Sequence, residues 1–293
     1  MTPAQKRVAV AQLQAEAGYP LARLCRLVGL SRSSYYYRPP ADQSGELIKA
    51  VQEVAGRFPT YGSRRITWQL RRAAQAWWVN RKRIQRLMRV WGLLKVPRRR
   101  TCRTTDSDHG CPRYPNRVKD LIIERPDQVW VSDITYIRLC TGFVYLAVVM
   151  DVFTRAIRGW QLRRTLDGEL TVQALDRALA NHCPEIHHSD QGLQYATQAY
   201  LALLRQHHVQ VSMATAGQPT ENGYAERVIR TIKEEEVYLS DYDSFTDAVG
   251  QIGQFIDDVY RFKRIHSALG YLTPAEFEAS WWQARKAEPS PLA

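Results

Sequence analysis

The sequence predicts an α/β protein in which a mixed β-sheet with flanking helices follows all-helical modules. Near residue 127, apolar residues change from helical spacing to strand-like runs. The charge balance changes sign at the same place, and three spaced carboxylates, Asp133, Asp190 and Glu226, lie beyond it. Because 293 residues exceed the usual size of one domain, we expect a catalytic-sized domain and smaller units.

The charge is divided unevenly along the chain. Residues 1–126 carry 26 Lys and Arg against 8 Asp and Glu, a net charge of +18, whereas residues 127–293 carry 15 against 21, a net charge of −6. A basic front and an acidic rear fit nucleic-acid docking coupled to a metal-dependent site. A solvated basic surface without a partner is disfavoured, because the positive residues cluster on helices instead of alternating with acids.

Residues 1–40 are predicted to form a helix-turn-helix module. Capping residues start the first and third helices, and Gly29 lies in the turn before the third. Arg32, Ser33 and Tyr36 could then face a DNA groove or its phosphates. Plain helical packing is the alternative, because any tight helical hairpin has a glycine in its turn.

A second helical DNA-binding module is expected over residues 46–96, after a linker rich in Pro, Gly and polar residues. Asn80 should cap its last helix, and Gly92 should end it. Ile84, Leu87, Met88 and Trp91 recur at helical spacing and should be buried. The basic residues that could meet DNA phosphates are Arg64, Arg65, Arg81, Lys82 and Arg86.

Residues 97–126 are expected to be a basic linker between domains. This segment holds several prolines and little apolar periodicity, so it cannot bury a core. Arg98, Arg99 and Arg100 could follow a phosphate backbone, and a merely solvated linker is an equal alternative.

Residues 127–240 should form the catalytic core, and residues 241–293 a C-terminal helical extension. The expected strands are 128–137, 143–151, 155–162, 185–188 and 209–213, and the expected helices are 167–182, 197–207 and 222–239. The order βββαβαβα describes a ribonuclease-H-like layered fold, with helices packed on a mixed sheet.

The three carboxylates fall where this fold can bring them together. Asp133 lies in the middle of a strand, a costly place for a charge unless it is paired or bound to metal. Asp190 follows a strand end, and Glu226 begins the long helix, whose dipole favours an anion. Arg230 and Lys233 share the face of Glu226 and could hold DNA phosphates. The pattern predicts a site for two divalent cations acting on a phosphodiester.

The residues around these carboxylates carry a resemblance to a known family. The sequence resembles orfB-type transposases of bacterial insertion sequences, which are of the DDE class and have a catalytic core similar to that of retroviral integrases. The matching segments are YGSRRI (61–66), residues 80–94, WVSDITYI (130–137), VMDVFTRAIRGW (149–160), HSDQGLQY (188–195), ENGYAERVIRTIKEE (221–235) and RIHSALGYLTPAEF (264–277). Thirty-five residues separate Asp190 from Glu226 inside these segments.

The resemblance implies a DNA transposase that cleaves the ends of its element and joins the freed 3′-OH to another phosphodiester. Asp133, Asp190 and Glu226 would hold two Mg²⁺ ions, with Mn²⁺ as a substitute, and Lys233 would contact the element end. The implied partners are double-stranded DNA at terminal inverted repeats and target, further copies of the chain, and an upstream helix-turn-helix protein. A non-catalytic DNA-binding protein or a decayed element is the alternative.

The cysteines, the histidines and Asp151 give weaker indications of function. Five scattered cysteines without a C-x-x-C pair indicate reduced thiols in a cytosol, and no apolar run suggests a membrane span. The family resemblance implies that this is a bacterial cytosol, near the nucleoid. Asp151 is expected to cap a turn instead of joining the carboxylate site. Zinc is disfavoured because the His and Cys clusters lack paired ligand spacing. These clusters are His182, Cys183, His187 and His188, and Cys102, His109 and Cys111.

Overall fold

The computed structural model describes residues 1–36, 44–73, 77–94, 113–140, 142–215 and 218–287. Its described residues fall into two compact units, Met1–Ala50 and Val51–Ala293. Each unit is described by itself below.

The first unit contains three helices in the region where the sequence predicts a helix-turn-helix module. Its helices are α1 (Pro3–Ala17), α2 (Leu21–Val28) and α3 (Arg32–Tyr36). Thr2 caps α1 as predicted, because its hydroxyl accepts a hydrogen bond from the Gln5 N–H at 3.3 Å. Gly29 ends α2 at a φ of +61°, a conformation that glycine adopts without strain. A small core forms from Val10, Leu24, Cys25 and Leu30.

The second unit begins within α4 (Ser44–Arg57) and continues with α5 (Ser63–Arg72) and α6 (Arg81–Val90). The predicted cap of α6 is confirmed, since the Asn80 side chain accepts from the Lys82 N–H at 2.9 Å. Ile84 and Met88 are buried as expected. The prediction for Trp91 is wrong: it is 51% exposed, because α6 ends one residue earlier.

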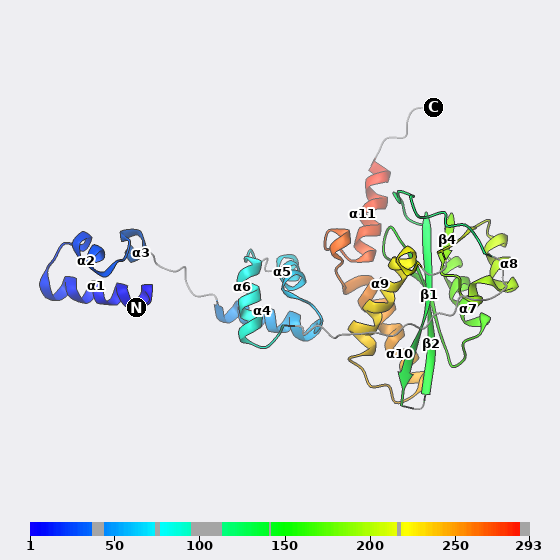
Figure 1. Ribbon diagram of the computed structural model, residues 1–293, viewed down its shortest axis with the longest axis horizontal. Helices are drawn as coiled ribbons and strands as arrows, with labels where there is room; N and C mark the ends of the chain where they lie inside the picture. The colour runs from blue at the N-terminus through cyan, green and yellow to red at the C-terminus, as the bar shows by residue number, and fades with distance from the viewer. Residues whose placement is uncertain (37–43, 74–76, 95–112, 141, 216–217, 288–293) are drawn as a thin grey trace. The chain divides into compact units, whose positions relative to one another are not determined.

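The sheet has five strands in the order β3-β2-β1-β4-β5. The strands are β1 (Val129–Leu139), β2 (Gly142–Asp151), β3 (Ile157–Arg163), β4 (Ile186–Ser189) and β5 (Gln210–Met213). The first three are antiparallel, whereas β4 and β5 run parallel to β1. This is the mixed sheet that the sequence predicts. Figure 1 labels β1, β2 and β4.

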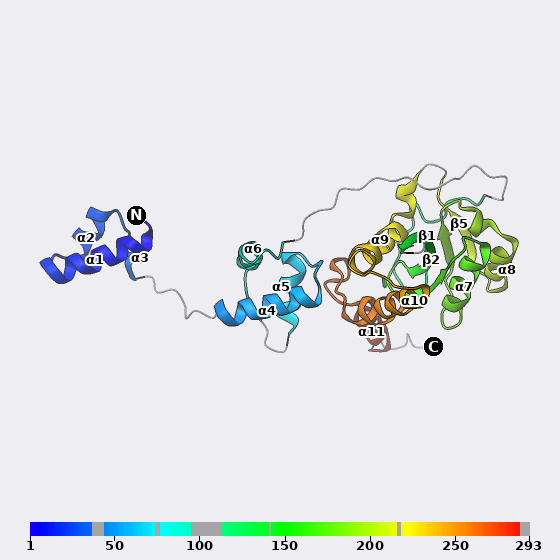
Figure 2. The same ribbon diagram turned by 90° about the horizontal axis from the view of Figure 1, so that it is seen from below.

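Helices cover both faces of this sheet (Figure 2). One face packs against α7 (Gly168–Leu179) and α8 (Gln198–Gln206), and the other packs against α9 (Gly223–Ile232) and α10 (Phe245–Gln254). The π-helical segments η3 and η4 prolong α9 and α10, and α11 follows. The bounds of the remaining elements are η1 (Leu193–Ala196), η2 (Pro219–Asn222), η3 (Lys233–Val237), η4 (Phe255–Lys263), η5 (Ser267–Leu269) and α11 (Pro274–Ala287).

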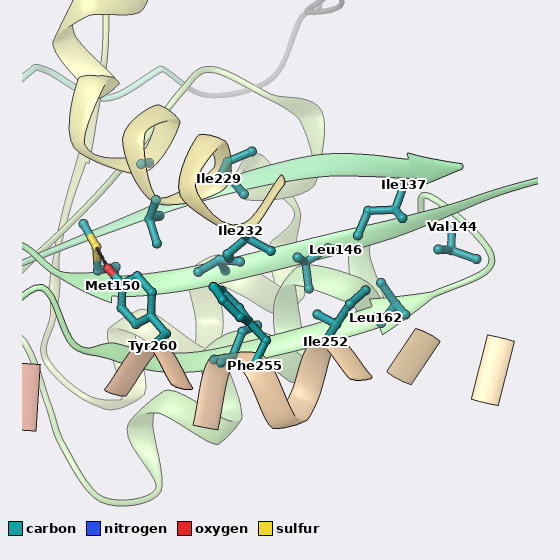
Figure 3. Close-up of a cluster of buried hydrophobic side chains, with 14 of the residues drawn as sticks. Ile137, Val144, Leu146, Met150, Leu162, Ile229, Ile232, Ile252, Phe255 and Tyr260 are labelled. Atoms are coloured by element: carbon teal, nitrogen blue, oxygen red, sulfur yellow. Dashed lines mark hydrogen bonds between the residues drawn. The ribbon is translucent and has the colours of Figure 1, made fainter. Parts of the chain in front are cut away.

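A large apolar cluster fixes α9 against the sheet (Figure 3). Ile229 and Ile232 on α9 meet Leu146 on β2, and Ile252 and Phe255 close the cluster from below. Burying such side chains stabilises the fold by about 1.5–3 kcal/mol each. The helix that carries Glu226 is therefore held rigidly on a ribonuclease-H-like sheet, as predicted. In the part of the chain that the structure describes, no helix is long and apolar enough to cross a membrane.

Candidate active site

Strand register brings Asp133 and Asp190 to the same place. The parallel pairing of β1 with β4 ends at Val131 opposite His188. Extending this register by two residues places Asp133 beside Asp190, which directly follows β4. Neighbouring strands lie about 4.8 Å apart, so the two carboxylates lie close together where β4 ends beside β1.

The backbone after β4 orients the Asp190 carboxylate. Its Oδ1 atom accepts a hydrogen bond from the Gly192 N–H at 2.9 Å. A Cβ atom on residue 192 would lie 2.9 Å from the same oxygen, closer than real Cβ contacts allow. A side chain at this position would therefore push the Asp190 carboxylate away from its hydrogen bond to the residue 192 N–H.

The first turn of α9 carries Glu226, and Asn222 ties that end of the helix to β1. The Asn222 side-chain amide donates a hydrogen bond to the Ser132 carbonyl at 3.2 Å, one residue before Asp133. Asn222 is 4% exposed, so this bond is shielded from water. Glu226 itself is exposed to solvent, where it can meet a ligand.

Electrostatics show that the three carboxylates share one neighbourhood. Burial, and then the negative charges of Asp190 and Glu226, together raise the pKa of Asp133 to about 7, while the Ile134 N–H and Lys233 act in the opposite direction. The pKa of the buried Tyr195 is also raised, first by burial and then by Asp133 and Asp190. An excess of negative charge therefore collects at this end of the sheet.

The spacing of these carboxylates is wider than that of a single-ion site. Among the described residues, only Asp127, His182 and Glu278 place potential ligand atoms all within 4.8 Å of one another. Asp133, Asp190 and Glu226 are electrostatically coupled without being that close. Two metal ions in a shared site are themselves about 3.5–4 Å apart, so ligands around a pair of ions spread more widely.

The compact Asp127, His182 and Glu278 group surrounds an arginine. Arg158 donates to Asp127 at 3.0 Å and to both oxygens of Glu278 at 2.6 and 3.1 Å. Its side chain is 2% exposed, and these carboxylates raise its pKa against the effect of burial. The guanidinium already supplies the positive charge there, so this group works as a buried ion-pair network that anchors α11.

A groove of about 590 Å³ adjoins the site along the end of β1 and η3. Lys233, the first residue of η3, lines it and holds its Nζ atom 4.7 Å from the centre of the Tyr136 ring. Arg138 also lines the groove, so two cations border it. This placement puts Lys233 next to the carboxylates, as its effect on the pKa of Asp133 also indicates.

Asp151 has a structural role, as the sequence suggests. Its Oδ2 atom accepts from the Thr154 N–H at 2.9 Å, and its Oδ1 atom accepts from the Asp127 N–H at 3.1 Å. The carboxylate is fully buried. Asp151 therefore caps the turn between β2 and β3.

Most of the predicted DNA-contacting residues are exposed, but Arg65 is engaged within the protein. Arg65 donates to Glu235 at 3.0 Å and is 19% exposed. Arg98, Arg99 and Arg100 lie outside the described residues. The exposed members are Arg32, Ser33, Arg64, Arg81, Lys82, Arg86 and Arg230.

The histidines near β4 have separate neighbours. His182 joins Asp127, His187 shares a hydrogen bond of 2.9 Å with the Tyr200 hydroxyl, and His188 shares one of 2.8 Å with Ser212. Cys183 donates to backbone carbonyls. Among the described residues these side chains form no joint metal site, and Cys102, His109 and Cys111 lie outside that part.

Sequence reasoning missed several residues that shape this region. Asn222, Gly192 and Tyr195 lie inside the matching segments, but their partners cannot be read from spacing. The Ser132 hydroxyl donates to Tyr195 at 3.3 Å, which braces β1 from below the carboxylates. Glu235 and Arg264 form a buried ion pair at 2.7 Å that no local pattern predicts.

Comparisons with protein families match both the helical and the sheet-containing part of the chain. Residues 123–219 match the family described as Integrase core domain, and residues 207–274 match a second family with that description. Residues 42–101 match the HTH-like domain family, so that description covers the second helical module.

Solved structures of integrases are similar in outline. The HTLV-2 integrase catalytic core domain in complex with magnesium superimposes with a TM-score of 0.44 and 18% identity, covering 52% of this chain and 97% of that one. A simian T-cell lymphotropic virus intasome in complex with the PP2A regulatory subunit B56 gamma gives a TM-score of 0.47 and 16% identity, over 83% and 78% of the two chains.

Relatives over nearly the full length come from insertion elements. A transposase of insertion sequence IS904 from Lactococcus lactis is 34% identical, covering 80% of this chain and 92% of that protein. The 31 kDa protein of insertion element IS600 from Shigella sonnei is 34% identical, over 89% and 99%. The transposase InsF of IS3A from Escherichia coli K12 is 30% identical, over 90% and 95%. With the fold and the match to the integrase core, these relatives establish that the chain belongs to the insertion-sequence transposases with an integrase core domain.

Proposed function

We propose that this transposase cleaves the ends of its insertion sequence and transfers the freed 3′-OH strand to a second phosphodiester at Asp133, Asp190 and Glu226. The observation that carries the proposal is the proximity of these three carboxylates: burial, and then the charges of Asp190 and Glu226, raise the pKa of Asp133 to about 7. Like charges are collected at one end of the sheet only at a cost, and a bound cation offsets that cost.

The donor set fits divalent cations of the Mg²⁺ type. Carboxylate oxygens are the ligands that Mg²⁺ and Mn²⁺ prefer, and Asp133, Asp190 and Glu226 offer them from the middle of β1, the residue after β4 and the first turn of α9. Two Mg²⁺ ions bound there would activate the attacking oxygen and stabilise the leaving one. The Asn222 and Gly192 hydrogen bonds would keep the carboxylates in place while DNA enters.

Basic residues around the site would hold the DNA. Lys233 borders the groove beside Asp133, and Arg230 is exposed one turn away, so both can contact phosphates of the element end. In the HTH-like module, Arg64, Arg81, Lys82 and Arg86 are exposed and can bind the terminal inverted repeat. Arg32 and Ser33 offer a further DNA contact in the N-terminal unit. Synapsis of two ends and a target would require further copies of the chain, and an upstream helix-turn-helix protein could assist.

A cleavage assay tests the chemistry. Purified protein is incubated with end-labelled DNA from the boundary of the element, with and without Mg²⁺, and products are resolved at single-nucleotide resolution. We expect Mg²⁺-dependent nicking that Asp190→Asn reduces at least about a hundredfold, because one metal ligand is lost. DNA binding should persist in this variant.

The control variant is Asp176→Asn, which removes an exposed carboxylate from α7 and should cleave like the wild type. Persistent cleavage by Asp190→Asn would contradict the assignment of the site. Binding without cleavage by the wild type would instead favour a non-catalytic DNA-binding protein.

A further inference from the structure

Two segments almost two hundred residues apart in the sequence meet in the second unit. They are YGSRRI (61–66), which leads into α5, and RIHSALGYLTPAEF (264–277), which connects η4 to α11. The Tyr61 hydroxyl accepts a hydrogen bond from the Ile265 N–H at 3.0 Å. Tyr61 is 1% exposed and Ile265 is fully buried, so this contact belongs to a packed interior.

A buried carboxylate lies at the centre of this contact. Arg264 donates two hydrogen bonds of 2.7 Å to the two oxygens of Glu235, and Arg65 donates a third of 3.0 Å. The side chains of Glu235 and Arg264 are 10% and 3% exposed. A paired guanidinium fork on a desolvated carboxylate is strong and geometrically specific. Arg65 thereby connects α5 to a pair that the catalytic core already forms by itself.

Aromatic stacking adds a second point of contact. The rings of Trp68 and Tyr271 stack with centroids 4.6 Å apart and planes 16° from parallel. Arg72, at the end of α5, donates to the Tyr271 carbonyl at 2.6 Å and pairs with Glu276. One face of α5 is therefore attached along its length to the turn before α11.

The attachment reaches the helix that carries the catalytic glutamate. Glu235 lies in η3, which continues α9 without a break, nine residues after Glu226. At 1.5 Å per residue, this is about 13 Å along the helix. On its other side α5 packs against α6, whose exposed basic residues include Lys82 and Arg86.

We propose that Arg65 and Trp68 form a rigid joint between the α5–α6 pair and the α9–η3 helix, and that this joint sets which phosphodiester reaches the carboxylates. DNA held by α6 would then enter at a fixed offset from Glu226, so cleavage would fall on one phosphate. This proposal rests on the proposed function, because it takes the DNA of the insertion sequence as the substrate. In this role Arg65 and Trp68 position the DNA without touching the reacting atoms.

Hydrogen exchange tests the joint without DNA or metal. We expect Arg65→Gln combined with Trp68→Ala to raise amide exchange in α5 and in residues 264–273 at least about tenfold, while the sheet stays protected. The core pair of Glu235 and Arg264 is left intact, so the protein should still fold. Arg64→Gln is the matched control, because it removes the same charge from an exposed neighbour and should leave exchange unchanged. Unchanged exchange in the double variant would overturn the joint.

Cleavage mapping tests its consequence. On end-labelled DNA, the double variant should spread cleavage over several adjacent phosphates, whereas Arg64→Gln should cut less DNA at the wild-type position. Arg65→Lys with Trp68→Phe should restore a single position. If the double variant cleaves at the single position that the wild type uses, Arg65 and Trp68 do not set the position of cleavage. If the wild type does not cleave at all, the proposed function fails, and the exchange experiment still decides whether the joint exists.

Discussion

The behaviour of Asp133 shows how single residues respond to the environment that the fold creates. An isolated aspartate ionises near pH 4, but burial beside Asp190 and Glu226 raises the pKa of this one to about 7. In the metal-free protein the raised value means that stability falls as pH rises from about 4 to about 7, because the unfolded chain releases this proton first. A bound cation would remove this loss of stability, because it would neutralise the ionised Asp133 carboxylate.

Cation affinity should therefore depend on pH. We expect the affinity for Mg²⁺ or Mn²⁺ to rise about tenfold per pH unit up to about pH 7 and then to level off, because binding must displace the proton on Asp133. Calorimetric titrations across this range measure both the affinity and the released proton. Lys233→Gln should move the plateau to higher pH, since Lys233 lowers the pKa of Asp133. An affinity that is constant between about pH 5.5 and 7.5 would contradict this explanation.

Packing between elements depends on close approach at a few glycines. A Cβ atom on Gly159 in β3 would lie 2.1 Å from the Ala174 carbonyl and 2.8 Å from the Ala178 nitrogen, both on α7. We expect Gly159→Ala to lower the free energy of unfolding by about 1–3 kcal/mol, because α7 must move away from the sheet. Urea-induced unfolding measures this change.

The matched control is a glycine in an open helical position. Gly250 lies in α10, and a Cβ atom there would meet nothing within 4 Å. Gly250→Ala should raise the free energy of unfolding by about 0.5–1 kcal/mol, since alanine loses less backbone entropy in a helix. Equal effects of the two substitutions would show that contact with α7 does not limit residue 159.

The elements of the core follow the sequence pattern closely, but the ends of the helices do not. The five strands form where apolar runs predict them, because the alternation and length of such runs are local properties. The helix expected over 222–239 instead changes at Lys233 into the π-helical η3. That segment holds Glu235, whose carboxylate is bound by Arg264 and Arg65 from distant segments. Helical spacing carries no information about such partners.

At the scale of the whole molecule, the division of charge predicts how DNA binding responds to salt. Four basic residues of α6, Arg81, Lys82, Arg86 and Arg89, are exposed, and each phosphate that they neutralise releases bound counterions. We expect Lys82→Gln to reduce the slope of log affinity against log salt concentration by about 0.9. Fluorescence anisotropy at a series of salt concentrations measures this slope.

A distant lysine serves as the control for this experiment. Lys286 is exposed near the end of α11, and Lys286→Gln removes the same charge. Its slope should equal that of the wild type. If both substitutions reduce the slope equally, the overall charge and not the face of α6 governs binding.

The sequence by itself determined the order of strands and helices and the candidate carboxylates Asp133, Asp190 and Glu226. Periodicity is a local property, and the motifs around the carboxylates resemble a known family. Only the tertiary structure decided that Arg65 is bound to Glu235, that Arg158 fills the Asp127 cluster, and that Asp133 holds its proton up to about pH 7. Each of these depends on side chains that are far apart in the chain and meet in a place shielded from water. An unpaired charge is costly there, so a charged side chain needs a partner of opposite charge or a bound proton.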